Sequence, residues 1–209
     1  MSDLRFERVT IIGVGLLGGS LGLALKRRGL AGRVTGIGRR RSSLDAAEKA
    51  GSIDESALEL TDDAAAADLI VVAVPAAQAA GFLDTLRDRI GATSVVTDVV
   101  STKGSLCAHA RDTWPHPSRF VGSHPMAGSE KWGPEHADAE LYRGAVTFVE
   151  TGAHLDPRAR VVVCELWETL GCHVVGIDPL LHDRLVAATS HVPHIGASAV
   201  AQGLPDDDA

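Results

Sequence analysis

The segment IIGVGLLGGSLGLAL near the start of the chain constrains the fold more than any other feature. Gly13, Gly15 and Gly18 have the spacing G-x-G-x-x-G, directly after an apolar run and at the start of a leucine- and alanine-rich stretch. In such a unit the glycines permit a tight turn, a close approach of the backbone to a pyrophosphate and close packing of helix on strand, while the helix N-terminus attracts the anion. The segment therefore predicts dinucleotide binding by Gly13, Gly15, Leu16, Leu17 and Gly18. The alternative is a glycine-rich turn that binds no ligand.

Short β-branched runs alternate with helical stretches along most of the chain. We expect strands at residues 8–14, 33–38, 69–74, 94–100, 119–123, 145–150 and 172–178, and helices at residues 16–28, 42–50, 77–90, 103–112 and 157–170. Near-continuous apolar strands separated by helices predict an α/β fold with a doubly wound, mostly parallel, Rossmann-type sheet covered on both faces. After Asp178 the pattern changes, because Asp178 and Pro179 are typical of a helix start and no further strand follows. We therefore expect a dinucleotide-binding domain at residues 1–178 and a helix that leaves it at residues 179–209.

Composition narrows the class of function. The chain has 209 residues, a formal net charge of −7 and no basic run longer than GRRR, which argues against nucleic acid or an anionic membrane surface as a partner. Its longest apolar runs are too short to cross a bilayer and no N-terminal signal segment is evident, so we expect a cytoplasmic protein. Its three cysteines are widely spaced without a C-x-x-C pair, which predicts neither disulfides nor a zinc site. Chemistry on a small-molecule substrate is therefore favoured.

The residues after two of the predicted strands bear on the cofactor. In GIGRRRSS, Arg39, Arg40 and Ser42 stand where an acidic residue would bind the ribose 2′-hydroxyl of NAD. Guanidinium groups suit a 2′-phosphate, so we expect NADP to be preferred over NAD; the alternative is a solvated helix start. Val74 and Pro75 follow another strand, at the usual rim of the cofactor cleft, although Pro75 is equally an ordinary strand terminator.

Three further motifs, VVSTKG, GSHPMAGSE and TSHVPH, complete a resemblance. Together with the glycine segment, in this order and at these separations, they closely resemble the prephenate and arogenate dehydrogenases of tyrosine biosynthesis, over essentially the whole chain. The resemblance implies an NAD(P)-dependent oxidative decarboxylation. In that reaction a hydride leaves the hydroxyl-bearing ring carbon, CO₂ departs and the ring becomes aromatic.

This chemistry gives roles to polar residues in the motifs. Removal of the hydride requires the hydroxyl proton to be accepted, and a neutral imidazole suits that task near pH 7. His124, expected on a loop after a strand, is the candidate base; a solvated loop histidine is the alternative. By resemblance Ser101 would hydrogen-bond the reacting hydroxyl or His124, although a helix N-cap is its simpler role. The resemblance also assigns five residues to the substrate pocket: Ser129, Glu130, Ser190, His191 and His194.

TSHVPH allows a second interpretation. His191 and His194 lie three apart, hence on one helix face, and could ligate a metal. No HExxH pattern or nearby carboxylate supports a metal, so none is expected, and the resemblance makes His194 a contact for a substrate carboxylate. Pro193 lacks a backbone N–H, so we expect the helix to kink there.

Family members continue past this helix into a helical domain that mediates dimerisation and supplies an arginine for the substrate carboxylate, whereas this chain stops at Ala209. We therefore expect either a fragment or a naturally shortened form, and a homodimer for the full-length protein. Two other functions stay open: another NAD(P)-dependent hydroxyacid or imine oxidoreductase, and a non-catalytic NADP(H)-binding module. The sequence does not separate prephenate from arogenate. Without the helical domain an apolar stripe should be exposed, formed by Leu181, Leu185, Val186, Ile195 and Val200.

Overall fold

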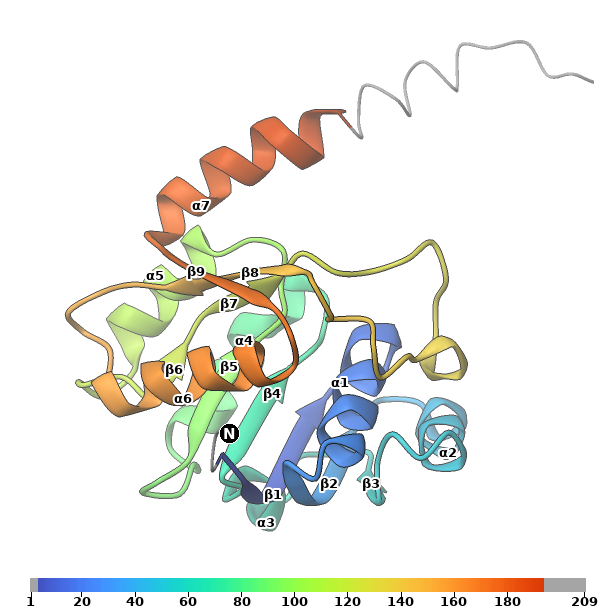
Figure 1. Cartoon of the computed structure of the whole chain (residues 1–209). Coiled ribbons are helices and arrows are strands. Elements are labelled where there is room, and N and C mark those ends of the chain that lie inside the picture. Colours follow the sequence, from blue (N-terminus) through green and yellow to red (C-terminus); the bar gives the residue numbers. More distant parts are fainter. Residues whose placement is uncertain (1–3, 194–209) are drawn as a thin grey trace, which may run out of the picture.

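The computed structural model describes residues 4–193, except for the side chain of His191, and it contains two sheets (Figure 1). The larger sheet has six strands in the order β3-β2-β1-β4-β5-β6, and all its neighbouring strands are parallel. Its strands are β1 (Phe6–Ile12), β2 (Ala31–Ile37), β3 (Glu55–Ala57), β4 (Leu69–Val72), β5 (Val95–Asp98) and β6 (Phe120–Val121). This order confirms the predicted doubly wound α/β fold. The prediction omitted β3, whose three residues ESA lack the apolar pattern of a strand.

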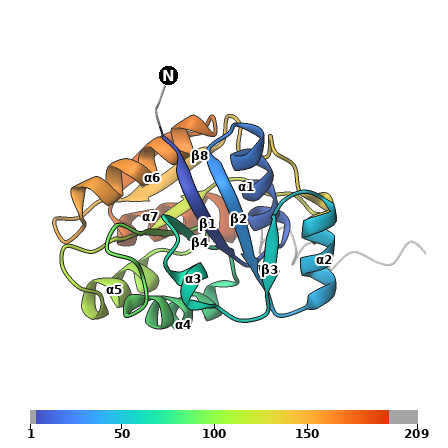
Figure 2. The ribbon, with the colours of Figure 1, turned by 90° about the horizontal axis from the view of Figure 1, so that it is seen from below.

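Helices cover both faces of this sheet. They are α1 (Leu16–Arg27), α2 (Arg41–Lys49), α3 (Asp62–Ala65), α4 (Ala76–Arg87), α5 (Gly104–Thr113) and α6 (Pro157–Thr169). Figure 2 shows α1 and α6 on one side of the strands and α3, α4 and α5 on the other. Consecutive strand residues alternate between the two resulting cores: Leu69 and Val71 pack with α1 and α6, whereas Ile70 and Val72 pack with α4 and α5. Burial of both faces explains why the strand sequences are continuously apolar.

A second, smaller sheet consists of β7 (Ser123–Pro125), β8 (Val146–Glu150) and β9 (His173–Ile177). β7 runs antiparallel to β8, and β8 runs parallel to β9. Our prediction of a single sheet was wrong for these strands, because the two later runs pair with each other and with β7. The predicted strand at residues 119–123 is also split, since the chain crosses at Gly122 from the large sheet to the small one. A Cβ atom at Gly122 would lie 2.5 Å from Cys107 Sγ, so any other residue at this crossing would displace that buried side chain.

The last described helix, α7 (Pro179–Val186), runs into a π-helical turn at Ala187–His191. Asp178 caps it by accepting hydrogen bonds from the N–H groups of Leu180 and Leu181, at 3.0 Å each. The π-helical turn precedes Pro193, whose missing N–H disturbs regular helical bonding, and the kink expected at Pro193 itself stays a prediction.

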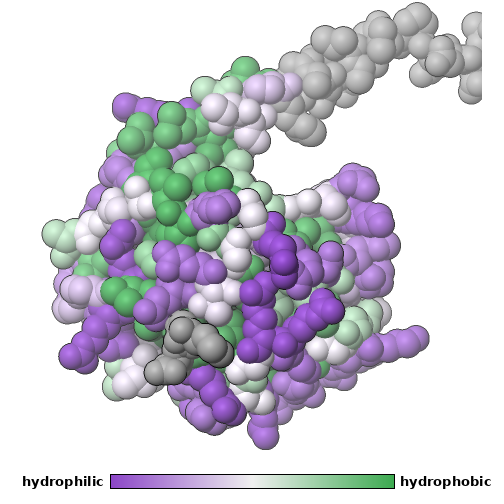
Figure 3. Space-filling view, in the orientation of Figure 1, coloured by the Kyte–Doolittle hydropathy of each residue, from purple (hydrophilic) through white to green (hydrophobic). Residues whose placement is uncertain are grey.

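One side of α7 packs on α5 and the other is exposed. Leu181 and Leu185 are exposed as predicted, together with Leu180, and Figure 3 shows hydrophobic side chains gathered where this helix lies. The prediction was wrong for Val186, which is buried although it lies on the same helix. Ile195 and Val200 lie outside the described residues.

Candidate active site

The carboxyl ends of the central strands reach one edge of the large sheet. Ile12 is in register with both Ile37 and Val72, and Val72 is in register with Asp98. The chain leaves β1 toward β2 on one side and returns as β4 on the other. This edge is therefore the topological switch point at which doubly wound sheets bind their ligands.

The glycine turn at this edge has the geometry of a phosphate cradle. Gly13 has φ +100°, and a Cβ atom there would lie 2.3 Å from the carbonyl oxygen of Ala73. A Cβ at Gly18 would lie 1.9 Å from the carbonyl oxygen of Gly13, so both positions need glycine for close packing. Gly15, in contrast, has open space around it and begins α1 without a side-chain cap. The first N–H groups of α1, at Leu16 and Leu17, thus meet the requirements of an anion site, and the residues present fit a dinucleotide.

Basic side chains follow β2 at the same edge. Arg39 and Arg40 are exposed, and within residues 4–193 neither side chain forms a hydrogen bond or an ion pair. Arg41 is different, because it donates to Ser56 Oγ at 3.1 Å. Ser42 is exposed in the first turn of α2. Arg39 and Arg40 are therefore accessible to a ligand at this strand end, as a 2′-phosphate contact would require.

The residues after β4 lie beside the glycine turn. A Cβ at Gly13 would come within 3.1 Å of a methyl group of Val74, and exposed Pro75 is the N-cap residue of α4. Both therefore lie at the rim of the switch point, as predicted.

His124 lies in β7, not on a loop as predicted. Its partner on the adjacent strand β8 is Phe148, and His124 is only 7% exposed. His124 Nδ1 is 3.0 Å from Nε2 of His182 on α7, and the two rings cross at 77°. The loop prediction failed because the residues SHP pair with β8, more than twenty positions later in the chain. His124 is thus a buried, hydrogen-bonded histidine and not a solvated one.

A buried acidic residue fixes the start of β7 against the end of β5. Asp98 is fully buried and accepts hydrogen bonds from the N–H groups of Ser123, at 3.0 Å, and Val100, at 2.9 Å, and from Lys103 Nζ. Burial raises the pKa of the Asp98 carboxyl, while Lys103 and the two N–H groups oppose that rise by stabilising the carboxylate. Ser123 Oγ is also bonded to Thr97 Oγ1, at 2.9 Å. His124 therefore stands one residue beyond the carboxyl edge of the large sheet.

The sequence analysis missed Asp98 and Lys103. A signal was present, because an aspartate stands inside the β-branched run SVVTDVV and a lysine follows five positions later. An acidic residue in a buried strand requires a partner, and this lysine is the nearest cation in the sequence.

Ser101 is exposed after β5 and does not cap α5. Lys103 occupies the N-cap position, and the carboxylate of Asp183 on α7 accepts the N–H groups of Lys103, at 2.7 Å, and Gly104, at 2.8 Å. The N-cap alternative for Ser101 is therefore wrong, because a distant aspartate performs that task. The catalytic role of Ser101 stays a prediction.

The other predicted substrate residues fall into two groups. Ser129 and Glu130 are exposed on the loop after β7, where Ser129 Oγ accepts the N–H of Lys131 at 3.1 Å. Ser190 is half-buried in the π-helical turn, whereas the side chain of His191 and the whole of His194 lie outside the described residues. Among residues 4–193 there is no cluster of histidine, cysteine and acidic side chains able to hold a metal ion.

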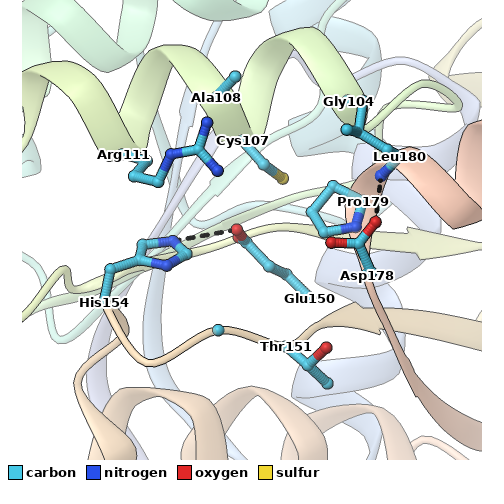
Figure 4. Close-up of a pocket in the computed structure, with 11 residues that line it drawn as sticks. Gly104, Cys107, Ala108, Arg111, Glu150, Thr151, His154, Asp178, Pro179 and Leu180 are labelled. Atoms are coloured by element: carbon cyan, nitrogen blue, oxygen red, sulfur yellow. Dashed lines mark hydrogen bonds and ion pairs between the residues drawn. The ribbon is translucent and has the colours of Figure 1, made fainter.

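A pocket of about 200 Å³ lies between α5, the end of β8 and the start of α7 (Figure 4). Buried Glu150 accepts the N–H of Gly122 at 3.1 Å and is paired with His154 Nε2 at 3.2 Å. Burial and the neighbouring Glu150 raise the pKa of the Cys107 thiol, which is therefore unreactive. Of the described residues that line this pocket, Gly104 belongs to the VVSTKG motif, and the others lie outside the motifs identified in the sequence.

In the part of the chain that the structure describes, no helix has the length and apolar character needed to span a membrane.

Comparison with known proteins gives consistent matches. The family model for the nucleotide-binding domain of prephenate dehydrogenase matches residues 21–176. Prephenate dehydrogenase from Bacillus subtilis is 32% identical over 195 residues, which are 93% of this chain and 53% of that protein. The chain thus spans about half the length of the curated relatives it matches.

Two solved structures are also similar. Prephenate dehydrogenase from Aquifex aeolicus, in complex with hydroxyphenyl propionate and NAD⁺, has a TM-score of 0.90 at 31% identity, covering 97% of this chain and 71% of that one. Arogenate dehydrogenase from Synechocystis has a TM-score of 0.83 at 29% identity, covering 96% of this chain and 71% of that one.

Proposed function

Because this chain belongs to the prephenate and arogenate dehydrogenase family, we propose that it is the cofactor-binding and proton-accepting part of an NAD(P)-dependent oxidative decarboxylase of prephenate or arogenate. One observation carries this proposal. Asp98, the last residue of β5, binds the N–H of Ser123, so β7 begins at the edge where the glycine turn lies. A buried histidine therefore follows directly after the nucleotide-binding edge.

In the proposed reaction the glycine turn would hold the pyrophosphate of a nicotinamide cofactor, which would supply the hydride acceptor. His124 takes up the hydroxyl proton as the C–H bond of the alcohol carbon breaks, which avoids a charged alkoxide. The Asp98–Lys103 pair holds Ser123, and with it the backbone of His124, against β5. Ser101 would bind the reacting hydroxyl, and Ser129, Glu130, Ser190, His191 and His194 would line the substrate side.

The cofactor preference is a finer proposal. The side chains of Arg39 and Arg40 follow β2 without partners in residues 4–193, and the sequence GIGRRRSS has no acidic residue there to bind a ribose 2′-hydroxyl. These features support NADP over NAD, although the similar Aquifex structure contains NAD⁺.

The larger assembly is likewise proposed. Residues 179–209 would lead into a helical domain that forms a homodimer and supplies an arginine to the substrate carboxylate. The exposed leucines of α7 and the greater length of the relatives support this. The free cysteines at 107, 164 and 172 are consistent with a reducing, cytoplasmic compartment.

The test is an assay of reduced-cofactor formation with prephenate and with arogenate, each with NAD⁺ and NADP⁺. We expect the 209-residue chain to bind cofactor in calorimetry. We define the family-length form as a chain extended by the helical domain, and we expect it to turn over one or both substrates at least about tenfold faster than the 209-residue chain, since each 1.36 kcal/mol in the barrier is tenfold in rate. Absence of turnover by the family-length form with all four combinations would overturn the proposal. Equal kcat/KM for both forms would show that no helical domain is needed.

A further inference from the structure

We propose that His182 and Asp183, adjacent on α7, are positioning residues that fix the ring proton of His124 on Nδ1 and leave Nε2 as the proton-accepting nitrogen. The catalytic role of this arrangement rests on the proposed function. The position of the ring proton on His124, however, is a property of the protein alone and is measurable without any substrate.

Two hydrogen bonds link Asp183, His182 and His124, and they determine which ring nitrogen is the donor in each bond. Asp183 Oδ1 is 2.8 Å from His182 Nδ1, and His182 Nε2 is 3.0 Å from His124 Nδ1. An ionised carboxylate only accepts, so His182 Nδ1 is the donor to Asp183. In a neutral His182 the single ring proton is then on Nδ1, and Nε2 has only a lone pair. Nε2 accepts from His124, which places the proton of neutral His124 on Nδ1.

The ionisation of Asp183 supports this direction. Burial alone would raise the pKa of its carboxyl, but the N–H groups of Lys103 and Gly104 and the ring of His182 stabilise the carboxylate and lower its pKa below the usual value. Asp183 is therefore ionised at neutral pH. The same contacts tie its side chain to the first turn of α5, so its oxygens have little freedom to turn away.

Packing holds the middle ring in place. His182 is fully buried, and its ring lies edge-on to Phe148, with ring centroids 5.1 Å apart. Phe148 is also the strand partner of His124, so β8 supports both members of the pair. Among the described residues, charged groups reach the pair from two elements: Asp183 on α7 is bonded to His182, and the Asp98–Lys103 pair is bonded to Ser123, which precedes His124 in β7.

The arrangement has a consequence for catalysis. When His124 Nε2 takes up a proton, Nδ1–H still donates to His182, and the negative charge of Asp183 stabilises the cation through the polarised ring between them. The proton stays on Nε2 of His124, and no second transfer is needed. α7 thus serves the active site as well as leading to the rest of the chain.

The direct test is NMR of the 209-residue chain labelled with ¹⁵N in histidine, with His124→Gln used to assign the His124 signals. We expect a protonated Nδ1 and an unprotonated Nε2 at neutral to mildly alkaline pH. We also expect this preference to be lost in His182→Leu, with cofactor affinity in calorimetry within about twofold as proof of an intact fold. A His124 that carries its proton on Nε2 in the unmodified protein would overturn the proposal.

A second test separates positioning from packing in the family-length form. His182→Leu fills the buried volume without an acceptor, whereas the amide oxygen of His182→Gln can accept from His124 Nδ1. We expect the leucine variant to lose at least tenfold in kcat with KM within threefold, to shift the acidic limb of its kcat/KM profile to lower pH, and to be exceeded by the glutamine variant at least fivefold. His173→Leu, on an exposed histidine of β9, is the control.

The outcomes distinguish the two proposals. A leucine variant as active as the glutamine variant would reduce His182 to a packing residue and overturn this inference. Absence of turnover in the unmodified family-length form would instead overturn the proposed function, while the NMR result would still decide the protonation state of His124.

Discussion

The glycine turn and the histidine site lie at the same edge of the large sheet but are built in opposite ways. The turn is local, because Gly13, Gly15 and Gly18 lie within six positions and act through backbone geometry. The histidine site joins Asp98, His124 and the residues of α7 through buried side-chain hydrogen bonds. We therefore expect the glycine turn to be less sensitive than the histidine site to substitutions elsewhere in the sequence, because the histidine site depends on three distant segments at once. The predictions below set one region against the other.

Replacing His124 should have the largest effect. We expect His124→Asn to reduce turnover of the family-length form by about 10²–10⁴-fold, the usual contribution of a general base. Cofactor affinity should stay within about twofold, because the phosphate cradle is made by other residues. Steady-state rates measure the turnover and calorimetry measures the cofactor affinity, with His173→Asn as the matched control. Near-normal turnover with an unchanged pH profile would remove His124 from the mechanism.

Replacing Asp98 should affect stability more than any change in the glycine turn. Asp98→Asn leaves the buried amine of Lys103 without its carboxylate, and breaking a buried ion pair costs about 3–5 kcal/mol. Denaturant unfolding of the 209-residue chain measures this loss. As a control, Asp63→Asn breaks an exposed ion pair with Arg8 and should cost at most about 1 kcal/mol. Equal effects of the two changes would show that burial of Asp98 is energetically unimportant.

The two regions also differ in how well the sequence foretells them. The strand–turn–helix unit follows from glycine spacing, because the close approach of Gly18 to Gly13 lies within the unit itself and Gly15 keeps the helix start open. His124 could be chosen as a base from its motif, but its position in β7 depends on pairing with β8, which no local pattern reveals. His182 and Asp183 carry no motif, and they become visible only when α7 packs on α5 and presents them to β7 and to the helix start.

Within the glycine turn, position 18 should be the least tolerant. Gly18→Ala places a Cβ 1.9 Å from the carbonyl oxygen of Gly13, which the backbone relieves only by moving. Overpacking of this kind costs about 1–3 kcal/mol, and we expect cofactor affinity to fall at least tenfold. Gly81→Ala is the control, since nothing lies within 4 Å of its Cβ and alanine should stabilise α4 by about 0.4–1 kcal/mol. Unchanged cofactor affinity in Gly18→Ala would contradict the cradle.

The arginines after β2 test the cofactor side alone. Charge-assisted hydrogen bonds contribute about 1.5–3 kcal/mol, so Arg39→Ala or Arg40→Ala should weaken NADP⁺ binding about tenfold or more with little effect on NAD⁺. Arg33→Ala, an exposed arginine within β2, should change neither affinity. Calorimetry with both cofactors measures these affinities, and tighter binding of NAD⁺ than of NADP⁺ by the unmodified chain would contradict the proposed preference for NADP.

The smallest expected effect concerns Asp183, which links the histidine site to the start of α5. Its carboxyl pKa is lower in the folded chain than in the unfolded chain, because the N–H groups of Lys103 and Gly104 and the ring of His182 outweigh the effect of burial. A lowered folded pKa contributes stability that is present above the unfolded value and lost as the pH falls through the folded one. Asp183→Asn should therefore lower the free energy of unfolding by about 0.5–2 kcal/mol at neutral pH, the range for loss of a helix cap. Below the normal range of an aspartate the difference between variant and unmodified chain should shrink, because both then carry an uncharged side chain. A difference that is constant from neutral to acidic pH would mean that the charge of Asp183 contributes nothing, and that α7 is held on α5 by packing alone.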